Sequence, residues 1–561
     1  MTRKLRSNFE RGTSFWAVRR AQWRALGLTD ADMEKPKIAV INTSSELAIC
    51  FSHLDGVAKM VKEAIRAAGG LPFEVRTTAP SDFIHSAGHR GNYILPMRDL
   101  ITNDIEVQVE GARLDGMVCL TSCDKTVPGQ LMAAARIDIP TIMVPCGYQP
   151  SGVFNNHHVD IEEVFLGAGH YVAGKIGFDE LLGMSENAIR GPGVCSGMGT
   201  ANSMHIVCEA LGMALPGSAP ILANSERMFD FARAAGRRIV AMVEEDLRPR
   251  QILTRGAFAN AAMAVLAVSG SINCIKHLQA TAVEAGSDLD FYKLFEDCTL
   301  RTPVLSAVRP IGDTSIEAFE NAGGAQAVLK QLEPLLHRDA LTVTGKTVGE
   351  NLKDAKVADT EVIRPLDRPL SPKAAIVMVR GSLAPSGGIV KVGLRHDKKL
   401  QFDGRAKCFS SADDAITALR AGKIVAGDAV ILRGLGVRGG PGMGMASRIV
   451  FAIDGAGLGP TVAIVTDGQL SGLVNKGLVV GEVNPEAATG GPLALVVDGD
   501  PISIDADAGT IELLVPEAEL AARRSKLKLT DQHSEEGWLA IYERSVQPLN
   551  KGAALVHPKS S

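Results

Sequence analysis

Aromatic side chains are scarce in this sequence, with Phe, Trp and Tyr making up 4% of its 561 residues. This composition offers little surface for stacking nucleic-acid bases, and a formal net charge of −4 offers no excess of cations for phosphates. No apolar run approaches the roughly 20 residues of a membrane-spanning helix, and the basic residues 1–15 lack the apolar segment of a signal peptide. We therefore expect a cytoplasmic protein with neither a nucleic-acid nor a membrane partner.

Paired cysteine motifs are also missing. The nine cysteines are odd in number, scattered, and include no CxxC pair, which argues against a disulfide framework. Most are expected to be small buried hydrophobes, and a few are candidate metal ligands.

Glycine, in contrast, is abundant at 58 residues, and 46% hydrophobic with 22% charged residues is typical of a soluble globular enzyme with many tight turns. A chain of this length is too long for one hydrophobic core. Three prolines, Pro365, Pro369 and Pro372, interrupt the pattern of elements. We place a domain boundary there and predict domains over residues 1–365 and 373–561.

Short apolar runs alternate with helical segments in the N-terminal part, which predicts an α/β fold with a doubly wound parallel sheet. The strands expected here cover residues 37–40, 73–77, 114–120 and 140–145. A mostly helical stretch follows over residues 161–352. Beyond the boundary the pattern becomes β-rich and favours a barrel-like domain. Its expected strands are residues 374–379, 388–393, 429–433, 461–465, 493–497 and 510–515.

The most unusual stretch is Cys123-Asp124-Lys125, which follows the third predicted strand and precedes a helix. A thiol, a carboxylate and an amine would therefore stand at the carboxyl end of a strand, where ligands bind in α/β sheets. For an arbitrary sequence, however, Asp124 and Lys125 would be an exposed ion pair at a helix start.

Two other cysteines, Cys50 and Cys195, also lie in polar or Gly-rich turns beside predicted helix starts. Helix dipoles would stabilise thiolates at such places. With Cys123 they would either hold an iron–sulfur cluster that leaves one iron coordination site open, or be three unrelated buried thiols. The Gly-rich residues 438–442 are a candidate anion cradle, through their backbone N–H groups.

Several motifs occur in one order along nearly the whole chain, and together they resemble the dihydroxy-acid and phosphogluconate dehydratase family, which includes aldonate (sugar-acid) dehydratases. The matching residues are Asn42, Glu46, Cys50, His53 and Leu54; Ser81, Asp82, Gly88 and His89; Ser122 to Lys125 with Pro128 and Gly129; residues 193–202, 341–347 and 439–443; and Thr466, Asp467, Gly468, Ser471 and Gly472.

This resemblance implies a role for each matched position. Cys50, Cys123 and Cys195 would hold a [2Fe–2S] cluster. Asp82, Asp124 and a carbamylated Lys125 would bind Mg²⁺, and Ser471 would accept a proton. A homodimer or homotetramer is expected from the family.

The implied reaction is that of a hydro-lyase acting on a small hydroxy acid. Loss of water from a 2,3-dihydroxy acid removes a weakly acidic C2 proton and expels a poor leaving group from C3, giving a 2-oxo-3-deoxy acid. An open iron site and Mg²⁺ would act as Lewis acids. A serine hydroxyl is a poor base, so Ser471 would act as an alkoxide stabilised by a nearby cation.

Some positions depart from the family pattern. Met445 stands where the family usually has a glutamate that completes the Mg²⁺ ligands, and a thioether is a poor ligand for this hard cation. Glu46 or another carboxylate would have to substitute. Leu473 replaces a hydroxyl residue, and Phe83 and His85 replace small residues after Asp82.

We interpret these departures as a changed substrate pocket, and they favour a sugar acid as substrate. The alternative is the dihydroxy-acid dehydratase of branched-chain amino-acid synthesis. A hypothesis from another class, motivated by Met445, is a cluster- or metal-binding protein without dehydratase activity.

Overall fold

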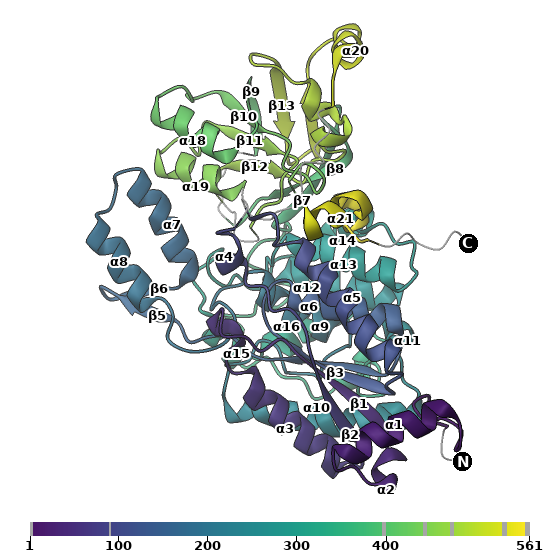
Figure 1. Ribbon diagram of the computed structural model, residues 1–561. Helices are drawn as coiled ribbons and strands as arrows, with labels where there is room; N and C mark the ends of the chain where they lie inside the picture. Colours follow the sequence, from purple (N-terminus) through teal and green to yellow (C-terminus); the bar gives the residue numbers. More distant parts are fainter. Residues whose placement is uncertain are drawn as a thin grey trace.

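Two sheets organise the chain: a parallel one near the N-terminus and a closed barrel near the C-terminus (Figure 1). The computed structural model describes residues 4–88, 91–394, 400–440, 446–471, 476–529 and 536–555. The predicted fold class, α/β with a parallel sheet followed by a barrel, is confirmed.

The N-terminal sheet has four parallel strands in the order β2-β1-β3-β4. They are β1 (Lys37–Asn42), β2 (Leu71–Arg76), β3 (Gly116–Thr121) and β4 (Thr141–Pro145). Every residue of β1, β3 and β4 is buried, which is the pattern of a sheet covered on both faces and explains their continuous apolar runs. The helices of this part are α1 (Ser14–Ala25), α2 (Asp30–Met33), α3 (Leu54–Ala67), α4 (Asp82–His85), α5 (Pro96–Gly111) and α6 (Thr126–Ile137).

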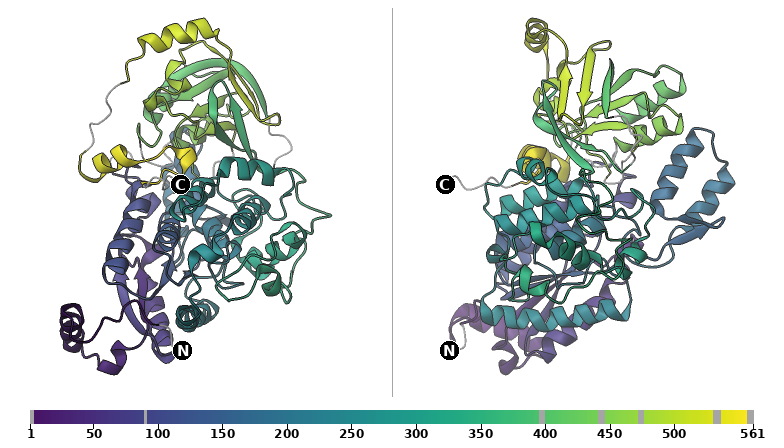
Figure 2. Two further views of the ribbon diagram at one scale, coloured as in Figure 1. Left: turned by 90° about the vertical axis from the view of Figure 1, so that its right-hand side faces the viewer. Right: turned by 180° about the vertical axis from the view of Figure 1, so that it is seen from behind.

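An arm projects from the body after β4, as Figure 1 and the right view of Figure 2 show. It consists of the hairpin β5 (Gly152–Phe154) and β6 (His157–Val159) and the helices α7 (Ile161–Val172) and α8 (Phe178–Asn187). The arm also touches the barrel part, because Phe165 of α7 packs edge-on against Phe451 with ring centroids 5.3 Å apart.

The middle of the chain is helical, as predicted. Its helices are α9 (Thr200–Ala210), α10 (Glu226–Glu245), α11 (Pro249–Ile252), α12 (Arg255–Ala267), α13 (Asn273–Glu284), α14 (Phe291–Thr299), α15 (Ile316–Asn321), α16 (Gly324–Leu332) and α17 (Val348–Asn351). Helices α9 and α13 are buried over their whole lengths, so they form the core on which the other elements pack.

The barrel closes in the order β10-β11-β12-β8-β7-β14-β13-β9. Its strands are β7 (Ile376–Gly381), β8 (Ala384–Lys391), β9 (Gln401–Phe409), β10 (Asp428–Leu432), β11 (Ala463–Thr466), β12 (Leu478–Gly481), β13 (Pro501–Asp505) and β14 (Thr510–Leu513). The helices around it are α18 (Ala412–Arg420), α19 (Ser447–Gly455), α20 (Glu517–Lys526) and α21 (Gly537–Ser545).

Not every strand of the barrel was predicted. The prediction missed β9, β12 and β13, and the strand expected over residues 493–497 was wrong. Much of that run lies in a 3₁₀ turn (Pro492–Leu495), because the proline begins a turn and the apolar side chains enter the core from it.

The C-terminal segment returns from the barrel to the helical part. Figure 1 shows α21 beneath the barrel, and its Tyr542 packs in one hydrophobic cluster with Leu95, the residue before α5. Arg98, fully buried in α5, donates a 2.8 Å hydrogen bond to the carbonyl of Ala553. The division at residues 365 and 373 stays a prediction. Within the described ranges, no helix combines the length and apolarity that crossing a membrane requires.

Candidate active site

The turn between β3 and α6 places Cys123, Asp124 and Lys125 at the carboxyl end of a buried strand. Ser122 Oγ donates a 2.6 Å hydrogen bond to the carbonyl of Cys50, which lies in the short 3₁₀ helix η1 (Ile49–Phe51) after β1. Because β1 and β3 are parallel neighbours, both segments leave the sheet at the same edge.

Three segments bring the predicted cysteine ligands together. Cys50 and Cys123 are 7% and 8% exposed, and their side chains are hydrogen-bonded to each other. Cys195 comes from the loop before α9 and interacts electrostatically with Cys50. Asn202 fixes that loop by donating 2.8 Å hydrogen bonds to the carbonyls of Cys195 and Gly197.

Burial and neighbouring groups raise the pKa values of two of these thiols. The hydrogen bond with Cys50, together with burial, raises the pKa of Cys123 well above its usual value. Burial and then the charge of Glu162 raise the pKa of Cys195 in the same direction. Both groups are therefore thiols at neutral pH unless a cation binds beside them.

Asp82, Asp124 and Lys125 form a second group at the same edge. Lys125 is fully buried, and its Nζ donates a 2.7 Å hydrogen bond to Asp82 Oδ2. Asp82 Oδ1 is also buried but has no hydrogen-bond partner among the described residues. Burial and the nearby charge of Asp82 raise the pKa of Asp124 to about 7, although the Thr200 hydroxyl and the Ala201 N–H donate hydrogen bonds to it.

One cavity of about 300 Å³ joins these groups to the predicted base. Its lining comes from the N-terminal part and the barrel part, and comprises Asp82, Phe83, Ser86, Ile94, Asp124, Glu162, Phe165, Cys195, Gly197, Gly199, Thr200, Ala201, Asn202, Asn273, Arg448 and Ser471. Ser471 is held at this wall by its backbone N–H, which donates a 2.9 Å hydrogen bond to Ser447 Oγ.

The Gly-rich loop after β10 binds carboxylates of the protein itself. Asp467 Oδ1 and Oδ2 accept 3.0 Å hydrogen bonds from the backbone N–H groups of Leu435 and Gly434. Glu486 accepts others from Arg438 and Gly439, at 3.1 and 3.3 Å. In the described part of the loop, these N–H groups therefore hold the loop in place. Because they already donate to carboxylates of the protein, they are not free to bind an external anion.

The amino-acid sequence matches both domains of one known family. Residues 35–351 match the N-terminal domain, and residues 361–553 the C-terminal domain, of dihydroxy-acid/6-phosphogluconate dehydratases. The chain belongs to this family. The resemblance seen in the motifs is thereby confirmed, and so is the enzyme class, a hydro-lyase.

Curated members of the dehydratase family align over almost the full chain. A protein of Ignicoccus hospitalis is 42% identical over 544 residues, 96% of this chain and 98% of its own. One of Caldicellulosiruptor saccharolyticus is 43% identical over 542 residues, with the same two shares. One of Methanosarcina acetivorans is 41% identical over 541 residues, 96% and 97% of the two chains. The first two are named dihydroxy-acid dehydratase and the third dihydroxy-acid dehydratase 1.

A further carboxyl group in this dehydratase, Glu162, was missed by the sequence reasoning. It lies in the first turn of α7, is 8% exposed, and has an Oε2 without a hydrogen-bond partner among the described residues. Burial, followed by the charges of Asp160 and Glu163, raises its pKa well above the usual value. Gly197 lies close to it, because a Cβ at that position would be 3.0 Å from Glu162 Oε1.

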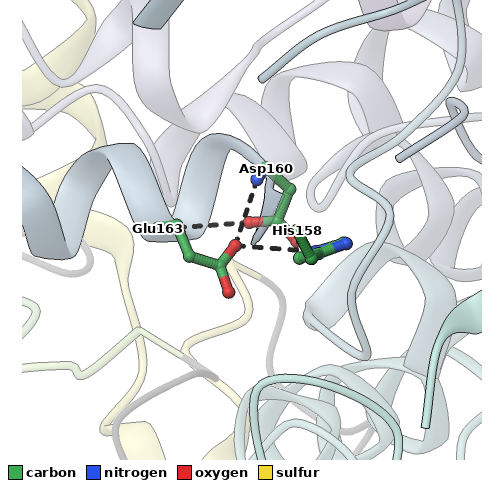
Figure 3. A group of neighbouring side chains, drawn as sticks. All are labelled: His158, Asp160 and Glu163. Carbon is green, nitrogen blue, oxygen red and sulfur yellow. Dashed lines mark hydrogen bonds and ion pairs between the residues drawn. The ribbon is translucent and has the colours of Figure 1, made fainter. Parts of the chain in front are cut away.

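The N-terminus of α7 is fixed by a capping box, which explains why Glu162 is held in place. Asp160 Oδ1 accepts hydrogen bonds from the N–H groups of Glu162 and Glu163, and Glu163 Oε2 accepts one from the N–H of Asp160. His158 lies 3.2 Å from Asp160 Oδ2 and completes this group (Figure 3). These three side chains therefore support the helix start.

Several positions singled out in the sequence do not join the site or lie outside the described residues. Glu46 is exposed and does not line the cavity. Phe83 lines the cavity, whereas His85 Nδ1 accepts a 3.1 Å hydrogen bond from the N–H of Ser81 within its own turn. The positions outside the described residues are His89, Pro441, Gly442, Met443, Met445, Gly472 and Leu473.

Proposed function

We propose that the protein is a dihydroxy-acid dehydratase, which removes water from a 2,3-dihydroxy carboxylic acid to give a 2-oxo acid. The observation that carries the proposal is the single cavity shared by Cys195, Asp82, Asp124 and Ser471. The names of the relatives support a branched-chain dihydroxy acid better than the sugar acid that the pocket departures suggested. We therefore reverse that preference.

The cysteines fit an iron–sulfur cluster. Cys50, Cys123 and Cys195 converge from three segments, and the raised pKa values of Cys123 and Cys195 mean that a positively charged group is needed to hold them as thiolates. We propose that they bind a [2Fe–2S] cluster, since three thiolates leave one iron position for substrate.

The second group fits Mg²⁺. Asp82 Oδ1, buried without a partner among the described residues, is an oxygen donor suited to a hard cation, and Asp124 stands beside it. A carbamylated Lys125 would replace its ammonium with a further oxygen donor facing Asp82. When bound, the two metal centres would supply Lewis acidity for the carboxylate and the departing hydroxyl group.

The chain's own residues hold the substrate and move its protons. The Ser471 alkoxide takes the proton from C2, the hydroxyl leaves C3, and the regenerated Ser471 hydroxyl returns a proton so that water departs. The enol product tautomerises to the 2-oxo acid. The hydrogen bond from the Ser471 N–H to Ser447 keeps this residue at the cavity wall, and Phe83 and Phe165 add apolar surface to the cavity lining.

A sugar acid remains a second candidate because of two polar groups in the lining. Glu162 has an oxygen without a hydrogen-bond partner in the described part of the chain, and Arg448 adds a guanidinium at the same cavity. Groups of this kind hydrogen-bond the extra hydroxyls of an aldonate, whereas a branched-chain substrate offers methyl groups.

Anaerobic purification followed by a substrate panel tests the proposal. Iron and sulfide analysis, an absorption spectrum, and kcat/KM for 2,3-dihydroxyisovalerate and several aldonates would be measured with and without Mg²⁺. We expect a cluster and preferred turnover of the branched-chain acid. Preferred turnover of an aldonate would reverse the substrate assignment, and a cluster without turnover would favour a non-catalytic homologue. Light scattering would test the expected homodimer or homotetramer.

A further inference from the structure

A fully buried ion pair crosses from the helical part to the barrel part. Lys276 of α13 contacts Glu482, which follows β12, and both side chains are 0% exposed. Taking two charges out of water costs free energy that their attraction only partly returns, so a pair of apolar residues would serve simple packing as well. The position of the pair suggests what else it does.

On the helical side, the pair leads to the cavity. Lys276 Nζ donates a 2.5 Å hydrogen bond to Asn273 Oδ1, and Asn273 lines the cavity. Asn273 Nδ2 in turn donates a 3.0 Å hydrogen bond to Thr200 Oγ1. The Thr200 hydroxyl donates to the carboxylate of Asp124, so two side chains connect Lys276 to a proposed Mg²⁺ ligand.

On the barrel side, the pair leads to Ser471. The backbone N–H of Glu482 donates a 3.1 Å hydrogen bond to the carbonyl of Gly468, three residues before Ser471. The preceding residue, Gly481, packs so closely on this segment that a Cβ there would lie 2.5 Å from Leu470 Cδ1. Glu482 is therefore fixed to the segment that ends in the proposed base.

We propose that Lys276 and Glu482 are positioning residues, which align the Ser471 segment of the barrel with Asp124 through Asn273 and Thr200. This inference rests on the proposed function, because it assigns a purpose to the alignment only if Ser471 and Asp124 act on one substrate. The pair does not touch the cavity itself and so acts only through its neighbours.

A double variant distinguishes a role of the ion pair in positioning the active site from a role in stabilising the fold. In Lys276→Met/Glu482→Met both charges are gone, so we expect a melting temperature close to that of the parent. We nevertheless expect a 10- to 100-fold weaker affinity for Mn²⁺, measured by electron paramagnetic resonance titration without substrate, and a similar fall in kcat with little change in KM. Parental Mn²⁺ affinity and kcat would overturn the inference.

Asn273→Ala provides a second variant should the double variant not fold. It keeps the ion pair but removes the hydrogen bonds of Asn273 to Lys276 and to Thr200, so we expect a folded protein with the same loss of Mn²⁺ affinity. Parental affinity would overturn the inference as well. The matched control is Lys293→Met/Asp297→Met, which removes an exposed ion pair on α14 and should change neither quantity.

The two proposals fail in different ways. A parent protein that turns over substrate, with variants that match it, would contradict the positioning role alone. A parent protein that neither binds Mn²⁺ nor turns over any acid of the panel would contradict the proposed function, and the inference with it.

Discussion

Asp82 is the partner of a fully buried lysine: its Oδ2 accepts a 2.7 Å hydrogen bond from Lys125 Nζ, while its Oδ1 has no partner among the described residues. The same carboxylate therefore neutralises a buried ammonium and presents a spare oxygen to the cavity. The paired oxygen predicts an effect of Asp82 on stability, and the other oxygen predicts an effect on metal binding.

Asp82→Asn should destabilise the metal-free protein kept free of carbon dioxide. Lys125 would keep its charge without an anion, which costs about 3–5 kcal/mol at buried sites. Thermal melting would measure the loss, and adding Lys125→Met should reverse much of it. Asp297→Asn is the matched control, because its ion pair with Lys293 is exposed. An Asp82→Asn protein at least as stable as the parent would contradict a charged Lys125 and would indicate one that is already carbamylated.

Mg²⁺ should raise the melting temperature of the parent protein but not that of Asp82→Asn. A ligand that binds only the folded state stabilises it by about 2.7 kcal/mol at one hundred times its dissociation constant. The comparison is made with cluster content held equal. Equal shifts in both proteins would remove Asp82 from the metal site.

Ser471→Ala should lower kcat by about 10²- to 10⁴-fold, since that is the usual contribution of a positioned base. The cluster spectrum and the melting temperature should stay unchanged, because Ser471 is held through its backbone N–H, which alanine retains. Ser525→Ala, on the exposed surface of α20, serves as the control. Retained turnover would exclude Ser471 as the base.

Glu162→Val should discriminate between the two substrate classes. If an aldonate is bound through this carboxyl, kcat/KM for that acid should fall by about 100-fold, whereas the value for 2,3-dihydroxyisovalerate should hold or rise. Measuring both acids with one protein preparation removes differences in cluster content. Equal losses for the two acids would mean that Glu162 supports the cavity wall without selecting the substrate.

Acid should destabilise the fold through buried neutral histidines. Burial lowers the pKa of His205 from 6.5 to about 4, so between these values the unfolded chain binds a proton that the folded chain does not. The contribution of neutral His205 to the free energy of unfolding is fully present above pH 6.5. It decreases as the pH falls, by about 2 kcal/mol at pH 5. The melting temperatures of the parent and His205→Gln at pH 7.5 and 5 would test this. An equally large drop in the variant would assign the effect to other groups.

Site residues that lie in one motif on one segment could be predicted from the sequence, whereas a residue brought to the site by the fold could not. Cys123, Asp124 and Lys125 follow an apolar strand directly, so their place at the sheet edge could be read from the chain. Glu162 could not, because Asp160 and Glu163 explain the helix start and nothing local shows that α7 faces the cavity.

Contacts between distant segments, and strands with an irregular pattern of polar and apolar residues, could not be predicted from the sequence. Lys276 and Glu482 meet because the barrel packs on α13 and α14. Neither residue lies in a sequence motif that would indicate the contact. Strand β9 contains Asp403, Gly404 and Lys407, which break the apolar pattern. It is a strand because β10 and β13 pair with it on both sides to close the barrel.

We propose that the cavity lined by Asp82, Asp124, Cys195 and Ser471 is the active site of a dihydroxy-acid dehydratase, with Ser471 as its base. The most direct measurement is the formation of 2-oxo acid from 2,3-dihydroxyisovalerate by anaerobically purified protein, parent and Ser471→Ala side by side, in the presence of Mg²⁺. We expect turnover by the parent and almost none by the variant, with identical cluster spectra. Equal rates for the two proteins, or no turnover by a cluster-loaded parent, would contradict it.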